Sequence, residues 1–235
     1  KMMKLNQFYI HEFKNFLDKI NYSQLLYFVI GNETISTDPL PPYSYVKRNI
    51  QRCPSDIESI MAFLILGEDI SEELIQNYLS KECLDYFCKI NILVKLTSEY
   101  RLNNLVITSY ANCYFFVSTP YYYRTCDSKV PSPYIGKDTF WLSRAVINRV
   151  KGRVLDLCTG SGIQSILAAK TSESVCAIDI DSHAIQIATI NSYLNEVNDK
   201  IEFICGDLYD ALFQAEINNT SFDYILSNPP FIPVP

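Results

Sequence analysis

The 235-residue sequence predicts an α/β fold in two parts, a mainly helical domain over residues 1–130 and a parallel-sheet domain over residues 131–235. In the second part, short apolar runs alternate with helical patterns, which is typical of strand–helix units that build a parallel sheet. In the first part, apolar residues recur at helical spacing, and the segment DPLPP at residues 38–42 separates the helices. The length suits two domains of ordinary size.

The N-terminal domain begins with helical periodicity from residue 7 to about residue 30. Beyond the prolines we predict three more helices, of which the first ends at Gly67 and the second is capped by Ser71, and then two β-like runs. These five elements cover residues 57–66, 71–79, 82–90, 92–96 and 100–107. Three helices followed by a hairpin indicate a winged-helix arrangement.

A winged helix raises the question of DNA binding. Its third helix contains CLDYFCKI at residues 83–90, with one lysine and one aspartate among apolar residues, whereas a helix that reads DNA needs an exposed polar and basic face. We therefore expect this domain to pack or to shape the substrate site rather than to bind a duplex. The run from Tyr121 to Arg124, YYYR, has two interpretations, a stack for a base or peptide, or core packing.

The composition argues against nucleic acid as a partner and against a metal site. The chain has 20 basic and 26 acidic residues and a net charge of −6, so it lacks the general basic surplus that binds phosphates, although Lys47, Arg48 and Arg52 form a local cluster. Its eight cysteines include no Cys-x-x-Cys pair and its two histidines stand far from any cysteine pair, so we expect no metal site. Reduced cysteines and the lack of an apparent leader or membrane-spanning run lead us to expect a cytoplasmic protein.

The parallel-sheet domain opens with RVLDLCTGSGIQSILAA at residues 153–169, a strand, a glycine-containing turn and a helix. Gly160 and Gly162 allow a tight turn and close approach of a ligand, and Ser161 leaves backbone amides pointing outward. The dinucleotide fingerprint requires a third glycine, and Ser165 occupies its position. A small polar ligand is therefore expected here, and a dinucleotide is disfavoured.

Two further strands end in carboxylates. The run VCAID at residues 175–179 ends at Asp179, which we prefer over Asp181 as the acceptor of the ribose hydroxyls of a nucleoside because it is flush with the strand end. Ser182 is the predicted cap of the helix that follows. A third strand at residues 201–205 precedes Gly206-Asp207-Leu208.

The last segment, FDYILSNPPFIP at residues 222–233, is an apolar run that stops at two prolines. We expect a strand buried on both faces that delivers Asn228 to the sheet edge. The side-chain oxygen of Asn228 and the carbonyl of Pro229 can both accept hydrogen bonds from one planar NH2 group, and Phe231 supplies a flat face. Two acceptors on one amine raise the electron density on its nitrogen, which prepares it to attack an electrophilic methyl group.

The four motifs DLCTGSG, AIDID, CGDL and NPPF follow one another in an order that resembles the class I S-adenosylmethionine-dependent methyltransferases. NPPFIP and the earlier segment YIGKDTFWL are most similar to the release-factor (protein glutamine N5) methyltransferase-like group. The resemblance covers roughly the last hundred residues. It implies a Rossmann-like domain with S-adenosylmethionine as cofactor. Such a sheet normally has seven strands, and only four candidates occur here, so we expect the natural chain to continue beyond Pro235 or another segment to complete the sheet.

The resemblance also assigns the site. Asp156 is the acid of the first motif, Cys158 replaces its first glycine, and Asp207 lies beside the adenine amine. Residues 134–146 form a lid whose helix is capped by Asp138 or Thr139. Within the lid, Phe140 and Trp141 either close the site or pack in the core. The cofactor-binding residues expected are Asp138, Thr139, Asp156, Cys158, Thr159, Gly160, Gly162, Asp179, Ile180, Asp207, Leu208 and Asn228. The catalytic residues expected are Asn228, Pro229, Pro230 and Phe231.

These features predict methyl transfer to a planar amide or amine nitrogen on a protein glutamine or a small molecule. Enzymes that methylate guanine in ribosomal RNA often carry a histidine after the motif phenylalanine, and Ile232 stands there. Two alternatives remain, a methyltransferase for adenine or guanine amines of nucleic acid, and a non-catalytic module that only binds the cofactor.

Overall fold

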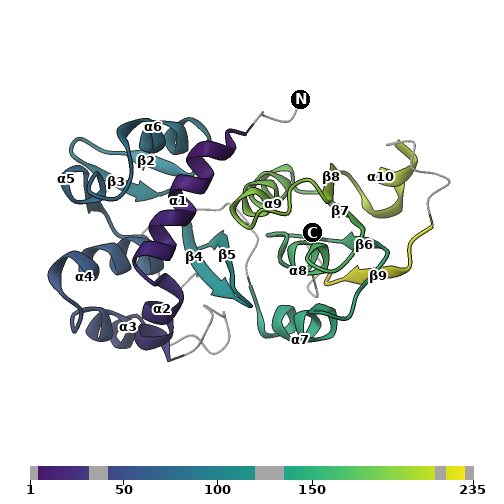
Figure 1. Cartoon of the computed structure of the whole chain (residues 1–235), viewed down its shortest axis with the longest axis horizontal. Coiled ribbons are helices and arrows are strands. Elements are labelled where there is room, and N and C mark those ends of the chain that lie inside the picture. Colours follow the sequence, from purple (N-terminus) through teal and green to yellow (C-terminus); the bar gives the residue numbers. More distant parts are fainter. Residues whose placement is uncertain (1–4, 32–41, 120–134, 215–220, 231–235) are drawn as a thin grey trace. The chain divides into compact units, whose positions relative to one another are not determined.

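The computed structural model describes residues 5–31, 42–119, 135–214 and 221–230. The chain divides into two compact units, Lys1–Tyr134 and Ile135–Pro235, where the sequence placed the boundary at residue 130 (Figure 1). Among the described residues no helix is both long and apolar enough to cross a membrane.

The first helical region is two helices rather than one, α1 (Gln7–Lys19) and α2 (Tyr22–Ile30). The break falls at Asn21, whose φ of 53° is left-handed, a conformation that asparagine tolerates better than most residues. The turn lets Tyr22 enter the core, where its hydroxyl donates a 2.6 Å hydrogen bond to the carbonyl of Ile107.

The helices predicted after the prolines are present with shifted bounds. The first ends at Gly67, which has a φ of 68°, and the second is capped by Ser71, whose hydroxyl accepts from the Leu74 amide at 3.3 Å, so both signals are confirmed. The second helix is shorter than expected and ends at Ile75. The bounds are α4 (Ser55–Met61), the π-helical turn η1 (Ala62–Leu66), α5 (Glu72–Ile75) and α6 (Lys81–Lys89). Another helix, α3 (Tyr43–Ile50), precedes them and was not predicted.

The strands of this unit form two antiparallel sheets. Strands β1 (Ile70–Ser71), β2 (Leu93–Lys95) and β3 (Glu99–Leu102) form one in the order β1-β3-β2, and β4 (Leu105–Tyr110) pairs with β5 (Cys113–Ser118) in the other. The single strand expected over residues 100–107 was wrong. Asn104 has a φ of 56°, and Asn103 donates its side-chain amide to the Asn91 carbonyl at 3.1 Å, so the chain leaves the first sheet there and enters the second.

An aromatic cluster forms the core of the N-terminal unit. The ring of Phe13 lies 5.0 Å from that of Phe87 and 5.3 Å from that of Phe116, and all three side chains are buried. Helix α6 contributes Phe87 together with buried Cys83 and Leu84. The third predicted helix therefore uses its apolar face for packing.

The C-terminal unit is a mixed α/β fold built on a parallel sheet. The four-stranded sheet has the order β8-β7-β6-β9. Its strands are β6 (Arg153–Leu157), β7 (Ser174–Asp179), β8 (Ile201–Cys205) and β9 (Tyr224–Ser227), and its helices are α7 (Lys137–Val146), α8 (Ile163–Ala169), α9 (Ser182–Leu194) and α10 (Leu208–Gln214). All four predicted strands are present.

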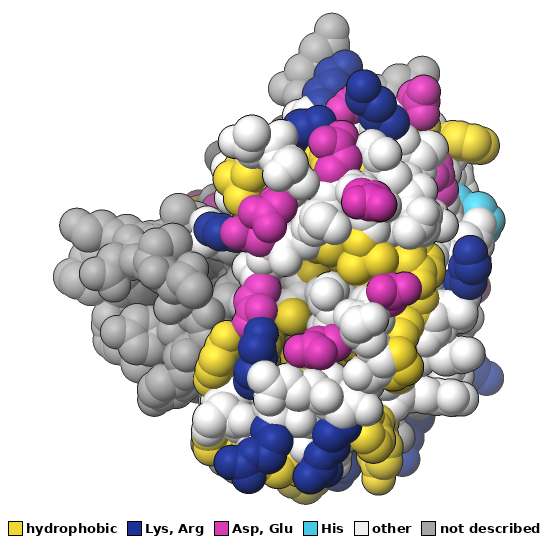
Figure 2. All heavy atoms as spheres, turned by 90° about the vertical axis from the view of Figure 1, so that its left-hand side faces the viewer, with side chains coloured by type: hydrophobic (Ala, Val, Ile, Leu, Met, Phe, Trp, Pro, Cys, Tyr) yellow, Lys and Arg dark blue, Asp and Glu magenta, His cyan; other side chains and the backbone are white. Residues whose placement is uncertain are grey.

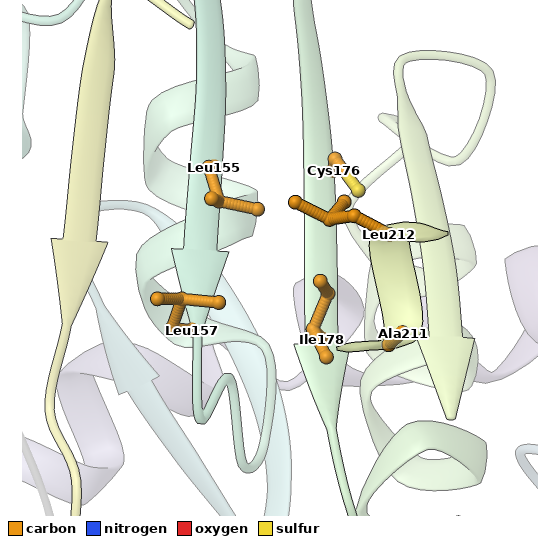
Figure 3. Packing of buried hydrophobic residues seen from close by; sticks show 6 residues of the cluster. All are labelled: Leu155, Leu157, Cys176, Ile178, Ala211 and Leu212. Carbon is orange, nitrogen blue, oxygen red and sulfur yellow. The ribbon is translucent and has the colours of Figure 1, made fainter. Parts of the chain in front are cut away.

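Helices lie on both faces of this sheet. Helices α8 and α9 contact the central strands on one face, and α10 contacts β7 on the other. The cluster under α10 consists of Leu155, Leu157, Cys176, Ile178, Ala211 and Leu212 (Figure 3). Buried apolar residues from two strands and a helix thus hold the sheet and α10 together.

Strand β9 differs from the expectation of burial on both faces. Leu226 is buried, but Tyr224 and Ile225 are 42% and 57% exposed. The reason is that β9 pairs only with β6 among the described residues, and α10 packs over β7 rather than over β9. Asn228 is nevertheless delivered directly after the end of β9, as predicted.

Substituting Phe87→Ala should lower the free energy of unfolding of the N-terminal unit by about 3–5 kcal/mol, because it removes the centre of the aromatic cluster. Urea denaturation followed by circular dichroism measures this loss. Phe8→Ala is the matched control, since Phe8 is 71% exposed and its loss should change stability by no more than about 0.5 kcal/mol. Equal effects of the two substitutions would contradict the cluster.

Candidate active site

The predicted site residues follow the carboxyl ends of the four parallel strands. Because the strand order is β8-β7-β6-β9, Asp207, Asp179, the loop after β6 and Asn228 occupy successive positions along one edge of the sheet. Adjacent strands lie about 4.8 Å apart, so this row extends over roughly 14 Å. Ligands bind at this edge in open parallel sheets.

The loop after β6 contains three alternate residues with a left-handed backbone. Cys158, Gly160 and Gly162 have φ values of 61°, 55° and 80°, all left-handed. Glycine adopts this conformation freely, whereas a residue with a side chain pays about 1–2 kcal/mol for it. The replacement of the first motif glycine by Cys158 therefore places strain at this turn. Burial and the neighbouring carboxylates, Asp179 first among them, raise the pKa of the Cys158 thiol.

Asp156 lies beneath this loop, and its side chain is 1% exposed. Its Oδ2 accepts hydrogen bonds from the hydroxyls of Thr159 at 2.7 Å and Ser165 at 2.6 Å. Burial raises the pKa of Asp156 to about 6, and the two hydroxyls oppose that rise. The hydrogen bond between Asp156 and Thr159 thus stabilises the conformation of the loop. Ser165, at the position of the missing third glycine, is a structural partner of Asp156 that the sequence reasoning did not anticipate.

Asp179 joins the loop to the neighbouring strand. Its Oδ2 accepts from the Gly160 amide at 2.8 Å and its Oδ1 accepts from the Asp181 amide at 3.0 Å. Ser182 was wrongly predicted as the cap of the next helix: Asp181 is the N-cap, and its Oδ1 accepts from the His183 amide at 2.9 Å. Since Asp181 is occupied by the helix end, Asp179 is the carboxylate at the end of β7.

The outer part of the row combines carboxylate and apolar groups. Asp207 is exposed, and the apolar side chains of Ile180 and Leu208 are 71% and 45% exposed. The Gly206 amide donates to the Asp179 carbonyl at 2.9 Å, which holds the ends of β7 and β8 together. Carboxylates suit the hydroxyls and amine of a nucleoside, and exposed apolar side chains suit the faces of its base. These residues therefore fit an adenosine group.

At the other end of the row, Asn228 contacts the first turn of α7. Its Nδ2 donates to Asp138 Oδ2 at 2.5 Å and lies 3.4 Å from Thr139 Oγ1. The predicted cap of α7 at Asp138 or Thr139 was wrong, because the N-cap is Gly136, whose amide donates to Thr139 Oγ1 at 3.4 Å. Both residues are in the first turn of the helix instead.

Two buried polar residues that the sequence reasoning missed hold this turn in place. Gln164 of α8 is 3% exposed and donates to the Thr139 carbonyl at 2.8 Å and to the Ser143 hydroxyl at 3.1 Å. The Ser143 hydroxyl donates in turn to the Thr139 carbonyl at 2.7 Å. The sequence did contain a sign of this role, because Gln164 is a long polar residue in the helix IQSILAA, whose other residues are apolar or small.

Of the remaining predicted residues, Pro229 and Pro230 are exposed after β9. Phe231, Ile232, the run 121–124 and the start of the predicted lid at residue 134 lie outside the described residues. In the part of the chain that the structure describes, no group of three or more His, Cys, Asp or Glu residues is placed to hold a metal ion.

Comparison with known proteins shows what the C-terminal unit is similar to. Residues 136–233 match the family model of the methyltransferase small domain. The ribosomal protein uL3 glutamine methyltransferase of Burkholderia pseudomallei is 39% identical over 85 residues, which cover 34% of this chain and 28% of that protein. The tRNA1(Val) (adenine(37)-N6)-methyltransferase of Porphyromonas gingivalis is 31% identical over 93 residues, 39% of this chain and 36% of that protein.

A solved structure, the SAM-dependent methyltransferase from Agrobacterium tumefaciens, aligns over 62% of this chain and 49% of its own with 21% identity and a TM-score of 0.42. The matched part of this chain spans only about a third of the two relatives' own length, 28% of the first and 36% of the second. The family match and the relatives support an S-adenosylmethionine-dependent methyltransferase domain in the C-terminal unit, with S-adenosylmethionine as its cofactor.

Gly162→Ala should destabilise the C-terminal unit and weaken cofactor binding. A Cβ atom at this position would lie 2.9 Å from the Cβ of Ala188, in a backbone with a φ of +80°. Gly31→Ala is the matched control, because Gly31 has a φ of +77° and nothing within 4 Å of the added atom. Gly162→Ala should therefore cost about 1–3 kcal/mol more than Gly31→Ala in urea denaturation. Equal costs would show that the close packing on α9 is not a constraint.

Asp156 should make stability depend on pH in the direction opposite to most aspartates. Its pKa is raised in the folded state from 3.8 to about 6, so the folded protein holds an extra proton between these values. The contribution of Asp156 is therefore greatest below pH 4 and falls by about 3 kcal/mol as pH rises to 7. Comparing urea denaturation of the wild type with that of Asp156→Asn from pH 4 to 7 isolates this loss. Asp199→Asn, at an exposed aspartate, should show no such dependence.

Proposed function

We propose that this protein transfers a methyl group from S-adenosylmethionine to a planar amide or amine nitrogen held at Asn228. The row of Asp207, Asp179, the loop after β6 and Asn228 along one sheet edge, within a matched methyltransferase domain, is the observation that supports the proposal. Its two ends suit different groups, a nucleoside at β8 and β7 and an amine acceptor at β9.

The cofactor is held by the residues that line three strand ends. Asp207 would accept from the adenine amine, Asp179 would accept from the ribose hydroxyls, and Ile180 and Leu208 would pack against the base. The loop from Cys158 to Gly162 borders the methionine part, and Asp156 and Thr159 keep the loop in shape. When bound, S-adenosylmethionine supplies an electrophilic methyl group whose bond to sulfur breaks as the acceptor nitrogen bonds to its carbon.

Asn228 and Pro229 prepare the acceptor. The Asn228 Oδ1 and the Pro229 carbonyl accept the two hydrogens of one NH2 group, which draws electron density toward the nitrogen and turns its lone pair toward the methyl donor. The same two dipoles stabilise the positive charge that grows on nitrogen as the new bond forms. The extra proton then leaves for water.

The N-terminal unit supports a protein or small-molecule acceptor. On the face of this unit in Figure 2, basic side chains gather near the upper and lower ends, and acidic side chains lie between them. Four of its described basic residues form ion pairs with carboxylates. The pairs are Lys14–Asp18 at 3.3 Å, Lys47–Glu68 at 2.5 Å, Lys95–Glu72 at 3.0 Å and Arg101–Asp69 at 2.5 Å. Paired cations are less available to phosphates, so we propose that this winged-helix-like unit shapes the acceptor site.

A nucleic-acid amine is the second candidate, because one of the relatives is named as a methyltransferase of tRNA adenine. The two acceptors differ in salt dependence. RNA binding weakens steeply as salt rises, since phosphate contacts release counterions, whereas binding of a protein loop with few charges does not. A third candidate is a module that binds the cofactor at this sheet edge and transfers no methyl group.

The full chain, incubated with S-adenosylmethionine labelled with tritium in its methyl group and a cell extract, tests these candidates. Label in the protein or small-molecule fraction supports the proposal, and label in RNA that disappears at high salt supports the second candidate. Binding of S-adenosylhomocysteine in calorimetry with no labelled acceptor would contradict catalysis.

Asn228→Ala should lower the transfer rate by about 100-fold or more while the dissociation constant of S-adenosylhomocysteine changes by less than about threefold, because Asn228 acts on the acceptor. Asn15→Ala, at an exposed asparagine of α1, is the control and should leave both quantities unchanged. Equal losses of binding and transfer in Asn228→Ala would contradict the assigned role.

A further inference from the structure

The orientation of the Asn228 side chain is determined by its partner. The oxygen and nitrogen of an amide differ only in whether they accept or donate hydrogen bonds, so their partners identify them. An ionised carboxylate only accepts, and Asp138 Oδ2 lies 2.5 Å from one end of the Asn228 amide. That end must be the NH2 group. Thr139 Oγ1, at 3.4 Å, is a second polar atom beside the same group.

Fixing the nitrogen of the amide also fixes its oxygen. The two atoms lie on the same planar carbon, so an NH2 group held by Asp138 leaves Oδ1 directed away from that carboxylate. An amide rotated by half a turn would present NH2 hydrogens to the acceptor amine, and two donors repel each other. The hydrogen bond to a charged carboxylate is also about twice as strong as a neutral one, and it increases the electron density on Oδ1.

Buried hydrogen bonds hold the helix turn that contains Asp138, the residue that orients the Asn228 amide. Asp138 is in the first turn of α7, and the carbonyl of the next residue, Thr139, accepts from both Gln164 at 2.8 Å and Ser143 at 2.7 Å. Gln164 and Ser143 are 3% and 0% exposed. Buried hydrogen bonds therefore connect the first turn of α7 to α8, the helix that follows the glycine-containing loop, so the loop and Asp138 keep a fixed relation.

We infer that Asp138 is a positioning residue for the acceptor nitrogen, which holds Asn228 with its oxygen toward the substrate and so selects an NH2 donor. This inference rests on the proposed function. It differs from the cofactor contact that the sequence resemblance implied for Asp138, because the polar contact seen at its carboxylate is to the residue on the acceptor side. A specificity follows, since an acceptor that lacks N–H hydrogens has nothing to donate to the fixed oxygen.

Substituting Asp138→Ala in the full chain tests this role. Methyl transfer from labelled S-adenosylmethionine to the extract fraction that the wild type labels should fall by about 10- to 100-fold, since the amide is free to rotate. The dissociation constant of S-adenosylhomocysteine should stay within about twofold. Asp138→Asn, which keeps a neutral oxygen at the same place, should lose less. In an Asn228→Ala background, Asp138→Ala should have no further effect, because the group that it positions is gone.

Asp56→Ala is the matched control. Asp56 is the second residue of α4 as Asp138 is the second residue of α7, and it is exposed, so both variants lose a carboxylate from the first turn of a helix. Both should lose a similarly small amount of stability, because each removes a carboxylate from the positive end of a helix, but only Asp138→Ala should lose transfer. A loss of S-adenosylhomocysteine affinity that matches the loss of transfer in Asp138→Ala would overturn the inference in favour of a cofactor contact, and unchanged transfer would overturn it as well.

Nuclear magnetic resonance of protein labelled with 15N-asparagine tests the contact between Asn228 and Asp138 without a methyl acceptor. The side-chain NH2 signal of Asn228, assigned by its loss in Asn228→Ala, should move in Asp138→Ala and stay in place in Asp56→Ala. An unmoved signal would overturn the inference. If the wild type binds no S-adenosylhomocysteine, or binds it and labels no acceptor, the proposed function fails separately and the signal still decides whether Asp138 orients Asn228.

Discussion

The buried carboxylate of Asp156 is the constraint on which the cofactor side of this molecule depends. It is inside the sheet–helix interface, and the hydroxyls of Thr159 and Ser165 compensate part of the cost of burying it. Those two residues bracket the turn that contains Gly160 and Gly162. The same carboxylate therefore holds the strand, the loop and α8 together, and the left-handed backbone at Cys158 is maintained by this surrounding structure.

Asp179 extends this constraint to the next strand. By accepting from the Gly160 amide it ties the loop to the end of β7, and the Gly206 amide ties the end of β8 to the Asp179 backbone. The acceptor end is tied by a second network, in which Gln164 of α8 holds the turn of α7 that contacts Asn228. Helix α8 is common to both networks, so the two ends of the row are positioned by one element. Methyl transfer needs such a fixed relation, because its catalysis depends mainly on alignment.

The relatives differ in the acceptor for which they are named. The two relatives match 85 and 93 residues of this chain and are named for different acceptors, a glutamine of a ribosomal protein and an adenine of tRNA. Both acceptors present a planar NH2 group, the kind of group that we propose Asn228 and Pro229 to hold. The proposal of a protein or small-molecule acceptor rests on the paired cations of the N-terminal unit.

The sequence alone determined the parallel strands and the residues at their ends, because apolar runs, glycines and strand-end carboxylates act locally. All four strands were predicted, as were Gly67 as a helix end and Ser71 as a cap. Three local predictions were wrong where a neighbour competes: Asp181 replaces Ser182 as a cap, Gly136 replaces Asp138 or Thr139, and the Asn103–Asn104 turn divides a predicted strand.

Only the tertiary structure decided which distant residues meet. Asn228 and Asp138 are 90 positions apart and Gln164 and Thr139 are 25 apart, and no periodicity or spacing relates them. The exposure of β9 likewise depends on where α10 packs, which the alternation of its own residues does not specify. Local patterns fix backbone conformation, whereas the partner of a side chain depends on strand order and helix packing, and these form only when the whole unit folds.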